Sequence, residues 1–365
     1  MPHGVPFWKG GASHQRRKYP AKHPHCMGFP LADWINRHEG LPHNLSQSGM
    51  KYSLQRSLKR LRPRNGSTLE ELQRAFAETL GIDPRRVFLT HGATEANAVT
   101  LWFLALELRK KWGRTPRAHV PALEYPPLQE GPGWSGFRRV PDPTASDLHV
   151  HSNPNNPRGT LVPHPATSRK GPLFLIDETF REFTPLRSAA IPGNSSIFVT
   201  GTLTKAYGAD ALRVGWVAIP PEWVDRFEPF HGNMVALIPQ ASLDGAMALL
   251  ARRQRIFQES REIFRRNERV LRRMLPGIPS LSAPVCFDEI SRTPGEGDRL
   301  ARWAVEKGVL VSPGGLFGDS RGVRICLTQR TFSADLARYI ALRREFLEGV
   351  HGFRKGAFPA GSNLS

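Results

Sequence analysis

Apolar residues recur along this chain at two spacings, which predict helices and strands in alternation. Leu69, Leu72, Phe76 and Leu80 lie three or four positions apart and predict a helix over 69–80, capped by Ser67 or Thr68. A second helix is predicted over 94–111. Short apolar runs bounded by turn residues predict buried strands at 87–90, 148–151, 173–176, 197–200 and 214–219. The alternation predicts an α/β architecture with a largely parallel sheet.

The last third of the chain predicts a smaller α+β unit. A helical region from about 240 to 275 is followed by a helix at 298–307, strands at 309–312 and 322–328, and a helix at 333–347. We expect a large domain over 66–265 and a small domain over 266–351, which the segment 29–65 joins. The basic stretch 1–28 predicts a disordered arm, and 352–365 predicts a tail.

Composition excludes several classes of protein. No apolar run is long enough to cross a bilayer, and the N-terminal stretch has no apolar secretory segment, so we expect a cytoplasmic protein without a membrane partner. The three cysteines fit neither a disulfide framework nor a metal-ligand spacing, and we expect no metal. Histidines gathered in the N-terminal stretch could bind metal, but a flexible tail explains them better.

The net charge of +19 would attract polyanions. However, the chain has no zinc-finger spacing, no ribonucleoprotein aromatic motif and no Gly-Lys-Ser/Thr phosphate loop. A solvated basic surface is the better explanation, with acidic or phosphorylated partners second. We do not expect nucleic acid as a partner.

One lysine, Lys205, is set in a context that suits covalent chemistry. It follows the apolar run 197–199 in a hydroxyl-rich turn, Thr202-Leu203-Thr204-Lys205, and Arg213 comes eight residues later. Burial and nearby cations favour the free amine, which can condense with an aldehyde. Taken alone, the lysine is equally consistent with an ordinary surface loop.

Three further motifs follow predicted strands, where open α/β sheets bind ligands. The strand–turn–helix segment 90–95 offers backbone amides and a helix dipole to a phosphate, or is an ordinary capped helix. The doubled Asn-Pro at 153–157 predicts a functional turn rather than a generic one. Asp177 ends a buried strand, where a carboxylate needs a cationic partner such as a protonated ring nitrogen, unless it caps a helix.

Two more side chains are candidates for ligand contacts. Tyr125 could lie flat on a heteroaromatic ring, although an isolated tyrosine often belongs to the core. Arg324 stands inside the apolar strand pattern Val323-Arg324-Ile325-Cys326-Leu327. Arginine suits bidentate recognition of a carboxylate, and a buried structural ion pair is the alternative.

In this order, the motifs resemble those of the class I/II aminotransferases, within the fold type I pyridoxal-phosphate enzymes, over roughly 40–348. The resemblance implies a three-layer αβα large domain with a mostly parallel sheet, a smaller α+β domain, pyridoxal 5′-phosphate as cofactor, and a homodimer. It also implies that Lys205 forms the internal aldimine and moves the proton between the substrate Cα and the cofactor C4′. Asp177 would pair with the pyridinium nitrogen.

The same resemblance implies roles for the other candidates. Asn156 would hydrogen-bond the phenolic oxygen of the ring, Tyr125 would stack on the ring, and Arg324 would clamp the substrate α-carboxylate. The phosphate would be held by Ala93, Thr94, Thr202 and Arg213. The segment 44–49, with Ser48 and Gly49, would line the substrate site together with Asn156.

The chain departs from the family pattern at several positions. Phe180 stands at a cofactor-contacting position where the family usually has tyrosine, so a donor to the phenolic oxygen is lost and the pKa of the aldimine nitrogen should rise. Arg158 replaces a usual threonine, and Ala211 a usual glycine. Tyr52 is the nearby candidate for the tyrosine that reaches the neighbouring subunit's phosphate. Short stretches after Tyr125 and before Asp177 predict a trimmed large domain.

We therefore expect a pyridoxal-phosphate-dependent aminotransferase that moves an amino group from an L-amino acid to a 2-oxo acid. Some relatives that decarboxylate or cyclise amino acids also lack the tyrosine. A decarboxylase, eliminase or cyclase acting on an amino acid, phosphorylated or not, is therefore the alternative. A third hypothesis is a basic binding protein on a degenerate enzyme scaffold. The sequence does not identify the amino donor and acceptor.

Overall fold

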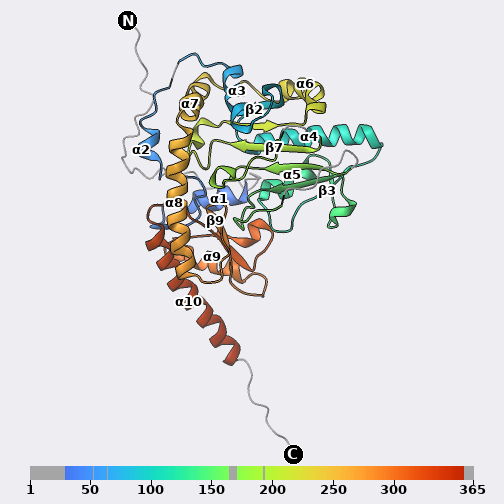
Figure 1. Cartoon of the computed structure of the whole chain (residues 1–365). Helices are drawn as coiled ribbons and strands as arrows, with labels where there is room; N and C mark the ends of the chain where they lie inside the picture. Colours follow the sequence, from blue (N-terminus) through green and yellow to red (C-terminus); the bar gives the residue numbers. More distant parts are fainter. Residues whose placement is uncertain (1–28, 52, 64, 164–170, 192–193, 357–365) are drawn as a thin grey trace, which may run out of the picture.

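The computed structural model of the chain describes residues 29–51, 53–63, 65–163, 171–191 and 194–356. A seven-stranded sheet has the strand order β2-β8-β7-β6-β5-β3-β4 (Figure 1). Its strands are β2 (Val87–Thr90), β3 (Arg117–His119), β4 (Arg138–Arg139), β5 (Leu148–Ser152), β6 (Leu173–Asp177), β7 (Ile197–Thr202) and β8 (Gly215–Ala218). Only β8 runs antiparallel to its neighbours in this sheet. The prediction of a largely parallel sheet is therefore confirmed.

Apolar side chains cover both faces of this sheet. Leu175 and Phe198 belong to one buried cluster, whereas their strand neighbours Ile176 and Val199 belong to another. Successive strand residues point to opposite faces, so the two clusters are the two sides of the sheet. Its helices are α3 (Leu69–Leu80), α4 (Ala93–Trp112), α5 (Pro126–Trp134), α6 (Val224–Met234) and α7 (Gln240–Leu250). The result is a three-layer αβα arrangement.

Helix α3 shows how local sequence sets the ends of an element. The Thr68 hydroxyl accepts a hydrogen bond from the Glu71 backbone N–H at 3.1 Å, and the Glu71 carboxylate accepts one from the Thr68 N–H at 3.0 Å. This reciprocal capping box satisfies two amide donors that the helix leaves free. Gly81 ends the helix in the left-handed conformation, with φ 72°, which glycine adopts without a Cβ clash.

The C-terminal part is built on a three-stranded antiparallel sheet of order β11-β12-β9. Its strands are β9 (Val285–Glu289), β11 (Ser312–Pro313) and β12 (Gly322–Cys326), and a separate parallel pair joins β1 (His43–Asn44) to β10 (Val309–Leu310). The remaining helices are α1 (Pro30–His38), α2 (Gln55–Leu58), α8 (Arg253–Met274), α9 (Glu296–Glu306) and α10 (Phe332–Gly356). Through β1, the N-terminal segment joins the C-terminal part.

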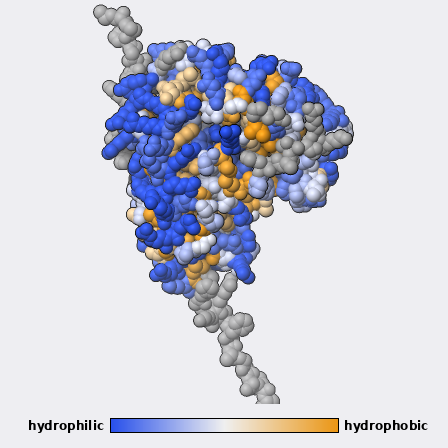
Figure 2. All heavy atoms as spheres, in the orientation of Figure 1, coloured by the Kyte–Doolittle hydropathy of each residue, from blue (hydrophilic) through white to orange (hydrophobic). Residues whose placement is uncertain are grey.

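Helix α8 runs beside both sheets (Figure 1). One buried cluster continues from the large sheet, with Trp216 and Val199, into the C-terminal part, with Leu300 and Tyr339. The outward face of α8 carries exposed arginines, and Figure 2 shows hydrophilic side chains gathered along this helix. A solvated basic surface therefore accounts for part of the net charge.

Three predicted elements differ from the structure. The helical region predicted over 240–275 is two helices, α7 and α8, and the strand predicted over 309–312 is split between β10 and β11, which pair with different partners. Helix α10 continues to Gly356, so residues 352–356, predicted as tail, are helical. The predicted arm at 1–28, the chain end at 357–365 and Tyr52 lie outside the described residues. Within the described ranges, every helix is too short or too polar to cross a membrane.

Candidate functional site

A cavity of about 380 Å³ lies at the carboxyl ends of β5, β6 and β7, whose last residues, Ser152, Asp177 and Thr202, line it. The structure brings every predicted site residue to this one cavity. They are Ser48, Gly49, Ala93, Thr94, Tyr125, Asn156, Asp177, Phe180, Thr202, Lys205, Arg213 and Arg324. Among the described residues, no group of three or more His, Cys, Asp and Glu side chains is placed to hold a metal ion.

Lys205 lies in the turn that follows β7. Its amine donates a hydrogen bond to the Ser48 hydroxyl at 3.0 Å, and its carbonyl accepts one from the Met50 N–H at 3.0 Å. Gly49 makes this close approach possible, because a Cβ there would lie 2.9 Å from the Thr204 carbonyl oxygen. Burial, and then the nearby Arg324 guanidinium, lower the pKa of Lys205 to about 8. Much more of the amine is therefore neutral at physiological pH than in a solvated lysine.

Asp177 is a buried carboxylate held by uncharged donors. It accepts hydrogen bonds from the Asn97 side-chain amide at 2.7 Å and from the Thr179 N–H at 2.9 Å. The Asn97 carbonyl in turn accepts one from the Thr200 hydroxyl at 2.7 Å, which fixes the orientation of the amide. The bond to Thr179 is a local turn bond and not the helix cap considered as the alternative, because the short helix that follows begins after Phe180 and has no side-chain cap. The Asp177 side chain also lines the cavity.

The first turn of α4 meets Arg213 and Thr202 at one corner of the cavity. Gly92, with φ 99°, precedes the helix, and no side chain caps it. A Cβ at Gly92 would lie 3.1 Å from the Arg213 Nη2 atom and 3.9 Å from the Thr202 hydroxyl oxygen. Helix amides, the helix dipole and a guanidinium therefore converge on one place, as an anion requires.

Arg324 is buried on β12, with 1% of its surface exposed. Its Nη2 donates to the Ser46 carbonyl at 3.0 Å and to the Ser312 hydroxyl at 3.1 Å, and its Nη1 to the Asn156 side-chain oxygen at 3.4 Å. Its buried Nε has no hydrogen-bond partner. Among the described residues no carboxylate forms an ion pair with it, so the guanidinium retains capacity for an anionic ligand.

Tyr125 and Phe180 supply aromatic walls. The ring of Phe29 meets the Tyr125 ring edge-on, with the centroids 5.8 Å apart. Phe180 is only 2% exposed and packs against Phe183, with the ring centroids 6.2 Å apart. Phe180 thus presents no hydroxyl to the cavity that it lines.

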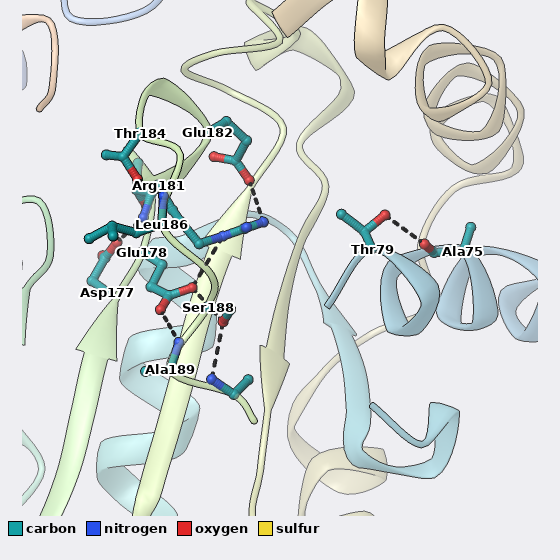
Figure 3. A network of polar contacts seen from close by, with 12 residues as sticks. Ala75, Thr79, Asp177, Glu178, Arg181, Glu182, Thr184, Leu186, Ser188 and Ala189 are labelled. Atoms are coloured by element: carbon teal, nitrogen blue, oxygen red, sulfur yellow. Dashed lines mark hydrogen bonds and ion pairs between the residues drawn. The ribbon is translucent and has the colours of Figure 1, made fainter. Parts of the chain in front are cut away.

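A buried polar network holds the loop that carries Phe180 (Figure 3). The Glu178 carboxylate accepts hydrogen bonds from the Ser188 hydroxyl and the Ala189 N–H, each at 2.6 Å. Arg181 lies between two carboxylates, 3.3 Å from Glu178 and 3.2 Å from Glu182. Burial raises the pKa of Glu178 to about 7. These contacts fix the chain directly after Asp177.

Glu124 is a second buried carboxylate, which the sequence reasoning missed. It accepts hydrogen bonds from the Tyr125 N–H at 2.7 Å, the Ser152 N–H at 2.9 Å and the Asn155 side-chain amide at 3.1 Å, and also from the Ser152 hydroxyl. The Ser152 hydroxyl oxygen accepts one from the Asn156 N–H at 2.9 Å. Burial raises the pKa of Glu124 to about 8. Glu124 therefore ties its own segment to the turn at 152–156, and both segments contribute residues to the cavity lining.

Asn97, which supports Asp177, and part of the cavity lining were also missed. Asn97 is a polar residue within the apolar helix pattern at 93–112, and that signal could have drawn attention to it. Glu124 directly precedes the tyrosine that was singled out, but nothing local marks it as buried. The missed lining residues are Phe29, Leu31, Ala32, Ile35, Asn36, Ser152, Thr179, Thr204 and Asp210, whereas Gln47 and Gly92 belong to the expected segments 44–49 and 90–95. Arg158 and Ala211, two of the positions that depart from the family pattern, are exposed and do not line the cavity.

Comparison with known proteins connects this site to one family. The family model for aminotransferase class I and II matches residues 36–338. An aspartate aminotransferase from Thermococcus kodakarensis is 25% identical over 236 residues, which cover 60% of this chain and 64% of that relative. A histidinol-phosphate aminotransferase from Paenarthrobacter aurescens is 25% identical over 237 residues, covering 56% and 61%. The match thus spans less than two thirds of the length of either relative.

Solved structures share the fold. A PLP-dependent aminotransferase from Streptococcus suis has a TM-score of 0.69 at 19% identity, covering 88% of this chain and 97% of that chain. The PLP-dependent cyclase OrfR has a TM-score of 0.69 at 21% identity, covering 92% and 100%. An L-threonine-O-3-phosphate decarboxylase from Porphyromonas gingivalis has a TM-score of 0.61 at 18% identity, covering 84% and 99%. Because proteins with different reactions share this fold, the fold alone does not select a reaction.

Proposed function

The chain belongs to the class I and II aminotransferase family, and we propose that it uses pyridoxal phosphate to move an amino group from an L-amino acid to a 2-oxo acid. The observation that carries this proposal is the position of Lys205. Its buried amine, with a pKa lowered to about 8, lines the same cavity as Asp177 and Arg324.

The described residues fit the cofactor at both of its ends. Gly92 leaves room beside Arg213 for a phosphate, and Ala93, Thr94 and Thr202 line the same corner. Asp177 offers a buried carboxylate whose donors are uncharged, which suits a protonated ring nitrogen. Asn156 and Tyr125 would contact the ring between these two ends.

When bound, pyridoxal phosphate supplies an aldehyde that condenses with amines and a ring that accepts the electron pair of a broken bond at the substrate Cα. The neutral fraction of Lys205 would make the covalent attachment. When it is not bonded to the cofactor, the Lys205 amine would take the proton from the substrate Cα. Arg324 would hold the α-carboxylate and so orient the substrate toward that amine.

A decarboxylase, eliminase or cyclase of the same fold is the second candidate. Phe180 favours it, because this residue brings no hydroxyl to the cavity. The solved structures of similar fold include a cyclase and a decarboxylase. The two candidates use the same residues for the cofactor and differ in which bond at the substrate Cα is broken.

We also propose that the chain acts as a homodimer. Trp134 and Leu237 are 78% and 80% exposed, and Trp102 is 50% exposed. Large exposed apolar side chains are available for an interface, and the proposal itself rests on the resemblance to a family whose members are usually dimers. Sedimentation of the purified protein measures the oligomeric state, and a monomer at all concentrations would contradict this part of the proposal.

Half-reaction spectra with single amino acids test the proposed reaction. Protein loaded with pyridoxal phosphate should be yellow, and at least one L-amino acid should convert the bound cofactor to pyridoxamine phosphate with release of the matching 2-oxo acid. Release of carbon dioxide without that conversion would favour the decarboxylase. A colourless protein that ignores added cofactor would contradict both candidates.

A further inference from the structure

One wall of the cavity comes from helix α1 and the residue before it. Leu31 and Ile35 lie four positions apart, as do Ala32 and Asn36, so the four share one helix face, and Phe29 precedes the helix. This wall is largely apolar.

The α1 wall is anchored to the rest of the protein. Leu31 is 3% exposed and belongs to a small buried cluster with Leu123 and Phe317, against which Ile35 packs. The Trp34 indole donates a hydrogen bond to the Val311 carbonyl at 2.8 Å, which fixes the helix to the C-terminal part. The apolar face is therefore a built surface with a defined position.

The charged side chains that line the cavity bear on which substrates it accepts. Within the described residues, its cationic lining side chains are Lys205, Arg213 and Arg324. The proposed function assigns these three to the cofactor aldehyde, the phosphate and the substrate α-carboxylate. Of the two carboxylates that line the cavity, Asp177 is assigned to the ring nitrogen, and Asp210 pairs with Lys51 at 3.3 Å.

Resting on the proposed aminotransferase function, we infer that the preferred substrates are amino acids with uncharged, mainly apolar side chains that pack against Leu31 and Ile35. An apolar side chain gains from leaving water at this wall. An anionic side chain would lose its hydration without gaining a cation. The Asn36 and Gln47 amides, also in the lining, offer hydrogen bonds to a single polar group at the end of such a side chain.

Binding of two carboxylates that lack an amino group tests this inference without turnover. The probes are 4-methylpentanoate, which has an apolar chain, and succinate, which has a second carboxylate. Calorimetric titration of the cofactor-loaded protein should show 4-methylpentanoate binding about tenfold more tightly or better, the scale on which such pockets discriminate. Ile35→Arg, which adds a cation to the wall, should weaken 4-methylpentanoate and strengthen succinate by a similar factor.

Ile35→Met is the matched control, because methionine is apolar and unbranched like the arginine stem. It should keep the preference for 4-methylpentanoate. If succinate binds the wild type as tightly as 4-methylpentanoate, or if 4-methylpentanoate does not bind, the inference is overturned. If aspartate converts the bound cofactor faster than leucine does, the inference also falls, but the aminotransferase proposal stands. If no amino acid converts the cofactor, both fall.

Discussion

The amine of Lys205 donates a hydrogen bond of 3.0 Å to the hydroxyl of Ser48, although 157 positions separate the two residues. Ser48 belongs to the N-terminal segment, which also pairs through β1 with β10 of the C-terminal part. The environment of the lysine therefore depends on this segment being docked. A buried amine lowers the stability of the folded protein when it is charged.

Lys205→Met should stabilise the cofactor-free protein at neutral pH. Burial lowers the pKa of Lys205 from 10.5 to about 8. Between these values the unfolded chain binds more protons than the folded chain, so the free energy of unfolding rises with pH through that window. Below it the buried ammonium costs roughly 3 kcal/mol, at about 1.4 kcal/mol per pKa unit. Urea unfolding should show that Lys205→Met exceeds the wild type in free energy of unfolding at pH 7 and that this difference becomes smaller above pH 10.

Lys110→Met is the control, because Lys110 is on the surface, with 77% of its side chain exposed. It should leave the pH dependence of unfolding as in the wild type. Equal pH dependence in Lys205→Met and wild type would contradict the lowered pKa.

Glu124→Gln should loosen the cavity. The carboxylate accepts hydrogen bonds from Tyr125, Ser152 and Asn155, and a glutamine amide would face one of these donors with its own N–H in either orientation. We expect a loss of roughly 1–3 kcal/mol in the free energy of unfolding above pH 8, where the carboxyl group is ionised. Affinity for pyridoxal phosphate, measured by fluorescence titration, should also fall, because Tyr125 and Asn156 lose their support.

The pH dependence provides a second measurement on the same variant. Burial raises the pKa of Glu124 from 4.5 to about 8, so the folded protein binds the extra proton within this window. The contribution that the protonated Glu124 makes to the free energy of unfolding is fully present below pH 4.5 and is lost as the pH rises through about 8. Glu124→Gln should remove that part of the pH dependence. Glu130→Gln, an exposed position in α5, should change neither measurement; matching effects in both variants would sink the assigned role.

Local pattern predicted much of this fold because many elements end where their own residues dictate. Helix α3 has both predicted ends, and Thr68 caps it as one of the two residues expected. The boundary at Ala251 and Arg252 between α7 and α8 was not predicted, because helix-forming residues continue through it. Strand 309–312 was predicted whole, but it divides because β10 pairs with β1, far away in sequence, whereas β11 pairs with the nearby β12.

The candidate site shows the same division. Lys205, Asp177 and Arg324 could be selected because charged residues beside buried strands need a reason to be there. Glu124 and Ile35 could not be selected from the sequence. Glu124 matters because it accepts a hydrogen bond from Ser152, and Ile35 because it packs near Phe317 and lines the cavity. Only the three-dimensional arrangement creates these contacts.

Arg324→Lys should weaken binding of the substrate carboxylate while leaving cofactor binding intact. Lysine keeps the charge but lacks the planar fork that can pair with both carboxylate oxygens. Losing a charged hydrogen bond of about 1.5–3 kcal/mol corresponds to a roughly 10- to 100-fold loss of affinity. Titration of 4-methylpentanoate measures it. Arg321→Lys, whose guanidinium pairs with Asp319 at 2.6 Å, should bind like wild type, and an unchanged affinity in Arg324→Lys would argue against the carboxylate role.

Phe180→Tyr should lower the pKa observed when absorbance of the bound cofactor is titrated with acid. The new hydroxyl would donate a hydrogen bond to the phenolic oxygen of the ring and stabilise its charge. A pKa unchanged from the wild type would mean that residue 180 does not reach the ring.

The central claim is that Lys205 holds pyridoxal phosphate covalently, and peptide mass mapping after borohydride treatment tests it most directly. In protein loaded with the cofactor, the added mass should appear on the peptide that contains Lys205. It should disappear in Lys205→Ala and remain in Lys110→Ala. Added mass on a different lysine, or an unmodified wild-type protein, would contradict the account.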